Sequence, residues 1–147
     1  MPAVALTRID HVGVAVHNLD EAVERYRTTF GLIVVAIETN ADQGVREAML
    51  QIDASDAEAG PHSYVQLLEP LGPDTPVGKY LARRGEGVHH IGYAVPDVAT
   101  AMRGLVAQGL RVLDERPRHG SLGASIAFVH PKDLNGVLTE LVQAASG

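Results

Sequence analysis

Two similar stretches decide the fold: Asp10-His11-Val12-Gly13-Val14-Ala15-Val16 and Val88-His89-His90-Ile91-Gly92-Tyr93-Ala94-Val95. His11 aligns with His90, 79 positions later, and each histidine begins the pattern His-apolar-Gly-apolar-Ala-Val. Alternate side chains of a strand share a face. Each copy therefore has one bulky apolar face suited to a core, and one face on which a histidine precedes small residues. This repetition predicts two half-modules that share a cavity.

The rest of the chain repeats the same order of elements. Hydrophobic periodicity and turn residues predict a strand, a helix and three strands twice over. The first set covers residues 9–16, 19–30, 32–38, 45–52 and 63–68, with a polar loop at 53–61. The second covers 88–95, a helix from Pro96-Asp97 to Gly109, then 110–115, 124–129 and 137–142. A connector holds a short helix at 77–84.

We therefore predict an α+β fold with two βαβββ modules in tandem. Module one spans residues 8–70, a linker with the short helix spans 71–87, and module two spans 88–143. Together they would form a single domain, 1–147, whose curved mixed sheet surrounds a metal-containing cavity.

Composition favours a cytoplasmic enzyme or binding protein. The chain has 147 residues, 46% hydrophobic and 20% charged, as in ordinary globular proteins. A net charge of -6 and the absence of Trp argue against a nucleic-acid partner. No apolar run approaches a membrane span, and the first residues predict no signal peptide. Because there is no Cys, any metal must have nitrogen and oxygen ligands.

Four polar residues occupy matched positions in the two halves. His11 matches His90, and Gln66 in the last strand of half one matches Glu140 in the last strand of half two. A buried polar side chain is costly unless it finds a partner. A single strand histidine is more often structural, but the two matched pairs favour a shared divalent ion. Two imidazoles, a carboxylate and an amide oxygen suit Co, Mn, Ni, Zn or Fe(II).

Glu47 breaks the internal symmetry. The 79-residue offset aligns it with Ile126, so a carboxylate in one half replaces an apolar residue in the other. It is either a catalytic group needed only once, or a solvent-facing strand residue paired with Arg46 or Lys132. Spacing alone leaves both interpretations open.

The chain resembles the vicinal oxygen chelate superfamily, and within it the methylmalonyl-CoA epimerase family, over nearly all of residues 9–142. The two most specific stretches are Gln43-Gly44-Val45-Arg46-Glu47 and Gly85-Glu86-Gly87-Val88-His89-His90-Ile91. The resemblance implies a divalent metal, usually cobalt, on His11, Gln66, His90 and Glu140. It also implies an acyl-CoA substrate, the CoA thioester of 2-methylmalonate, and a homodimer.

The implied reaction is interconversion of the 2R and 2S epimers. Proton removal from C2 gives an enolate, whose charge a divalent metal would stabilise as a Lewis acid. Inversion needs an acid/base group on each face of C2. The resemblance assigns these roles to Glu47 and Glu140.

The chain departs from the family pattern after Pro117-Arg118. A basic residue that commonly precedes the next strand is replaced by Ser125. Ser121, Gly123, Ser125 and Arg118 are therefore our candidates for binding anionic groups of the substrate.

Two other classes of protein remain open. His11, His90 and Glu140 would also suit an Fe(II) dioxygenase, although Gln66 would add a fourth ligand. A glyoxalase-like lyase would more naturally have a glutamate in place of Gln66. A protein that only sequesters a small ligand would need no base such as Glu47.

Overall fold

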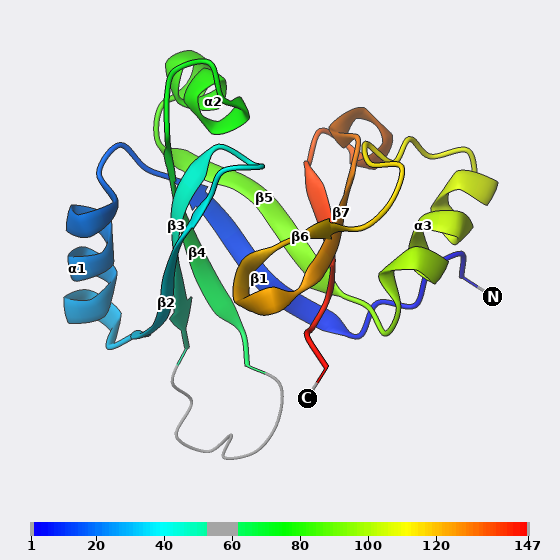
Figure 1. The fold of residues 1–147 in the computed structure, drawn as a ribbon, viewed down its shortest axis with the longest axis horizontal. Coiled ribbons are helices and arrows are strands. Elements are labelled where there is room, and N and C mark those ends of the chain that lie inside the picture. Colours follow the sequence, from blue (N-terminus) through cyan, green and yellow to red (C-terminus); the bar gives the residue numbers. More distant parts are fainter. Residues whose placement is uncertain (1, 53–61, 147) are drawn as a thin grey trace. The chain divides into compact units, whose positions relative to one another are not determined.

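The computed structural model describes residues 2–52 and 62–146, and it divides into two compact units (Figure 1). One unit is His11–His89, and the other combines Met1–Asp10 with His90–Gly147. The loop predicted at 53–61 lies outside the described residues.

The His11–His89 unit contains a mixed sheet and two helices. Strand order is β2-β3-β4-β1, with β1 parallel to β4 and the other neighbours antiparallel. Asn18 accepts a hydrogen bond from the N–H of Glu21 and so caps the first helix, which ends at Gly31 with φ 68°. The elements in chain order are β1 (Arg8–Ala15), α1 (Leu19–Phe30), β2 (Ile33–Asn40), β3 (Val45–Gln51), β4 (Tyr64–Pro70) and α2 (Pro76–Arg84).

Helices pack on both faces of this sheet. On one face, α1 buries Leu19 against Leu50 and Leu67. On the other, α2 packs Val77 and Leu81 against Ala15, Val45 and Leu68. Full burial of each of these leucines contributes about 1.5–3 kcal/mol to stability.

The second unit repeats this arrangement with one helix. Its strand order is β5-β8-β7-β6, with β5 parallel to β8 and β7 antiparallel to β8. Helix α3 packs on one face, where Val98 and Met102 meet Val129 and Leu141. The elements are β5 (Gly87–Ala94), α3 (Val98–Ala107), β6 (Arg118–His119), β7 (Ser125–Val129) and β8 (Thr139–Gln143), with 3-10 turns at Ser121–Gly123 and Pro131–Leu134.

The predicted α+β class and the repeated βαβββ order are confirmed. The strand predicted at 110–115 is wrong, since only Val112 forms an isolated bridge, to Val129. The ladder cannot continue because the carboxylate of Asp114, not a backbone carbonyl, accepts the N–H of Phe128. The third element of the second module is instead the two-residue strand β6. The single-domain organisation stays a prediction.

No helix in residues 2–52 or 62–146 is long and apolar enough to cross a membrane.

Candidate metal centre

In the His11–His89 unit, strand register places three buried polar side chains on one face. Gly13 pairs with Gln66, and Gln66 pairs in turn with Met49. Because side chains alternate along each strand, His11, Gln66 and Glu47 share a face. They are 3%, 5% and 3% exposed. The sheet therefore presents an imidazole, an amide and a carboxylate together, away from water.

A hydrogen bond joins two of these groups. Nε2 of Gln66 donates to Oε2 of Glu47 over 3.1 Å. The amide is thereby oriented so that its carbonyl oxygen is the atom it would offer to a metal.

Burial decides between the two interpretations of Glu47. The side chain is buried, and the adjacent Arg46 pairs with Asp20 across 3.0 Å. The solvent-facing interpretation is therefore wrong. A buried carboxylate beside a candidate ligand is a suitable group for proton transfer.

In the other unit, β5 and β8 carry His90 and Glu140, which are 3% and 4% exposed. Gly92 pairs with Glu140, so His90 and Glu140 lie on the same face of the sheet. The ring of His90 meets that of Phe128 edge-on, with centroids 5.7 Å apart and planes at 83°. The ring of Phe128 therefore packs against His90, next to the strand that carries Glu140.

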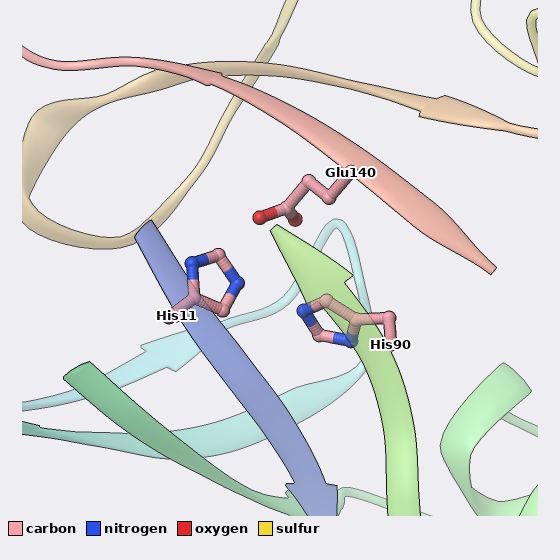
Figure 2. Close-up of side chains that lie close together, drawn as sticks. All are labelled: His11, His90 and Glu140. Carbon is pink, nitrogen blue, oxygen red and sulfur yellow. The ribbon is translucent and has the colours of Figure 1, made fainter. Parts of the chain in front are cut away.

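Within this unit, one ligand atom of His90 lies within 4.8 Å of one of Glu140 (Figure 2). Figure 2 shows the imidazole of His90 next to the carboxylate of Glu140. Two imidazole nitrogens and a carboxylate oxygen are ligands that first-row divalent metals accept, and their burial would exclude competing water. The donor set therefore fits a divalent metal ion.

His89, next in the chain, has a different environment. Its ring packs edge-on against Tyr80, with centroids 5.1 Å apart. Burial lowers the pKa of His89 to about 4, so the imidazole is neutral at physiological pH. Alternation along β5 turns it away from the face of His90, as the sequence predicted.

The four candidate anion-binding residues have unlike surroundings. Arg118 lies in β6, where its Nη1 is 3.3 Å from Oδ1 of Asp114. Ser121 and Gly123 bound a 3-10 turn whose middle residue, Leu122, has φ 57°. Ser125 pairs with Gln143, which places it on the face opposite Glu140. The side chain of Ser125 therefore does not point toward a ligand bound at Glu140.

Two residues of this region were not singled out from the sequence. Asp114 accepts from the backbone of Phe128, and Phe128 packs against His90. The alternation in Ile126-Ala127-Phe128-Val129 does indicate that Phe128 and Val129 face opposite ways. Which of them faces Glu140 depends on the pairing register of β7 and β8, and local sequence does not contain that information.

The chain is similar to known proteins over most of its length. Residues 10–128 match the model of the glyoxalase/bleomycin resistance protein/dioxygenase superfamily. An ethylmalonyl-CoA/methylmalonyl-CoA epimerase of Cereibacter sphaeroides is 37% identical over 92% of this chain and 97% of its own.

Solved structures are more similar still. A methylmalonyl-CoA epimerase in complex with methylmalonyl-CoA and NH4+ is 55% identical, with a TM-score of 0.90 over 97% of each chain. A variant of the Streptomyces coelicolor methylmalonyl-CoA epimerase, in complex with 2-nitronate-propionyl-CoA, is 54% identical. Its TM-score is 0.90 over 97% of this chain and 100% of that one.

Proposed function

The chain belongs to the glyoxalase/bleomycin resistance protein/dioxygenase superfamily and, within it, to the methylmalonyl-CoA epimerase family, and we propose that it interconverts (2R)- and (2S)-methylmalonyl-CoA. The observation that carries the proposal is the buried carboxylate of Glu47, hydrogen-bonded to Gln66 on the face that also bears His11. A protein that only stores a ligand would have no use for this group.

The reaction requires an acid/base group on each side of C2. The C2 proton lies between a thioester carbonyl and a carboxylate, and its loss gives an enolate. We assign its removal and return to Glu47 and Glu140, each acting on one face.

We further propose that His11, Gln66, His90 and Glu140 hold a divalent ion. The donor chemistry supports cobalt, which the family favours, and would also accept manganese, nickel, zinc or iron(II). When bound, the ion would supply Lewis-acid stabilisation of the negative charge that develops on the substrate. Glu140 would then act both as ligand and as acid/base group.

Substrate contacts, assembly and location are parts of the same proposal. Ser121, Gly123 and Arg118 are the proposed contacts for anionic groups of the acyl-CoA, with Ser125 as the weakest of the four candidates. The family resemblance supports a homodimer, and the composition of the chain supports a cytoplasmic location.

A matched pair of glutamate variants tests the proposal. Glu47→Gln preserves shape but not basicity, whereas Glu24→Gln alters an exposed carboxylate on α1. Exchange of the C2 proton of methylmalonyl-CoA is followed by proton NMR in D2O, with each protein loaded with Co(II). We expect Glu47→Gln to lose roughly 100- to 10,000-fold in exchange rate, and Glu24→Gln to match the unsubstituted protein. A Glu47→Gln protein with a near-normal rate would exclude Glu47 as the base.

A further inference from the structure

The backbone of Phe128 is held on one side of β7 by two hydrogen bonds. Its N–H donates to Oδ2 of Asp114 over 2.9 Å, and its carbonyl accepts from the N–H of Leu113 over 2.8 Å. Both polar groups therefore point away from β8. In an antiparallel ladder, a residue oriented in this way forms a non-hydrogen-bonded pair with the residue opposite, and such pairs bring their side chains closest together.

The residue opposite Phe128 is Glu140. The two side chains thus share a face at the closest spacing a ladder allows. The same phenyl ring meets the imidazole of His90 edge-on, with centroids 5.7 Å apart. Ile126 and Val142 pack on the same side of the sheet and support the ring. One aromatic side chain therefore adjoins both His90 and Glu140, the two proposed ligands of this unit.

Asp114 links this contact to its surroundings. Its side chain is 8% exposed, and Oδ1 lies 3.3 Å from Nη1 of Arg118 while Oδ2 accepts from Phe128. The carboxylate thereby fixes the outer edge of β7 at the residue whose ring reaches His90. The proposed reaction does not require a carboxylate at Asp114. We therefore explain the burial of this carboxylate by its hydrogen bond to the backbone of Phe128.

We propose that Phe128, held in place by Asp114, is a positioning residue that fixes the orientation of the His90 imidazole for metal binding. The torsion that turns an imidazole about its Cβ–Cγ bond is broad, so packing has to select one orientation. An edge-on phenyl ring restricts that rotation and keeps water from the adjoining side of Glu140. This inference rests on the metal-binding part of the proposed function and not on epimerisation.

The test compares Co(II) affinity among variants of the metal-free protein, by calorimetry or competition with a chelator. Phe128→Leu keeps bulk and removes the ring, Phe128→Tyr keeps the ring, and Val129→Ala removes volume from the opposite, α3-covered face. We expect Phe128→Leu to bind Co(II) roughly 10- to 100-fold more weakly, the usual effect of losing a group that orients a ligand. Phe128→Tyr should bind Co(II) with an affinity within about threefold of that of the unsubstituted protein. Val129→Ala, though destabilised, should bind as the unsubstituted protein does.

A double-variant cycle tests the role of Asp114. If Asp114 acts through Phe128, Asp114→Ala weakens Co(II) binding alone but adds nothing to Phe128→Leu. Visible absorption of the bound Co(II) should shift in Phe128→Leu and not in Val129→Ala, since only the former changes ligand geometry.

Other outcomes overturn the proposal. Equal affinities and spectra for Phe128→Leu and the unsubstituted protein would remove Phe128 from this role while leaving the metal site intact. Equal losses in Phe128→Leu and Val129→Ala would show a general effect of stability. Absence of Co(II) binding by the unsubstituted protein would overturn the proposed ligand set itself.

Discussion

Replacing Gly120 by alanine will destabilise the protein because the added methyl group has no space. An ideal Cβ at this position would lie 2.6 Å from Cγ2 of Ile126 and 3.3 Å from its Cδ1. The backbone of Gly120, with φ -118° and ψ -168°, is extended and acceptable for alanine. The cost therefore arises from packing alone, against a β-branched side chain that is 2% exposed.

The expected magnitude follows from the contact. Ile126 has little freedom at χ1 and is surrounded by Ala124, Val142 and Phe128, so it cannot move aside freely. Forcing a methyl group into such a core costs about 1–3 kcal/mol in free energy of unfolding. For a chain of this length, that corresponds to a fall in Tm of roughly 3–10 °C.

A double-mutant cycle identifies the cause. Urea unfolding is measured for the unsubstituted protein, Gly120→Ala, Ile126→Ala and the double variant. Ile126→Ala alone should cost about 2–5 kcal/mol, and it removes all the atoms that the new methyl group would meet. In that background Gly120→Ala should cost less than about 0.5 kcal/mol, because the clash is gone. An equal cost in both backgrounds would refute the packing argument.

Three further predictions concern a cap, an ion pair and the metal. Thr75→Ala should cost about 1 kcal/mol in urea unfolding, because Oγ1 of Thr75 accepts from the N–H of Gly78 and caps α2; an unchanged midpoint would contradict this. The Arg111 guanidinium lowers the pKa of Asp133 to about 2, so the carboxylate stabilises the fold above its unfolded pKa, near 4. At pH 5 the urea midpoint of Asp133→Asn should therefore lie below that of the unsubstituted protein, and this difference should shrink as the pH falls toward 2. A difference that is unchanged by pH would argue against the ion pair. Addition of Co(II) to chelator-treated protein should raise Tm in proportion to the logarithm of its free concentration above Kd; an unchanged Tm would argue against a site.

The repeat made the modules and the candidate ligands predictable because both depend on local alternation. His11 precedes Gly13 and Ala15 on one face, and the register of β1 with β4 brings Gln66 to that face. In the second module, the pairing of Gly92 with Glu140 places His90 and Glu140 on one face. Comparison of the two halves also singled out Glu47, since Ile126 stands at the matching position and is a core residue.

The failures lie where distant contacts override local pattern. Residues 110–115 have the composition of a strand, yet the side chain of Asp114 takes the N–H that a neighbouring strand would have bonded. Ser125 stays a candidate for anion binding, although its pairing with Gln143 turns it from the face of Glu140. Phe128 was overlooked because its closeness to His90 depends on how two strands pair, which one strand's sequence does not specify.

The fate of a single epimer of methylmalonyl-CoA is the most direct test of the proposed activity. Co(II)-loaded protein is incubated in D2O with one pure epimer of methylmalonyl-CoA, and the epimers are separated and analysed for deuterium at C2. We predict that both epimers accumulate and that the newly formed epimer carries deuterium at C2, because inversion proceeds through loss of the proton. Recovery of the starting epimer alone, without deuterium above the protein-free background, would contradict the proposed function.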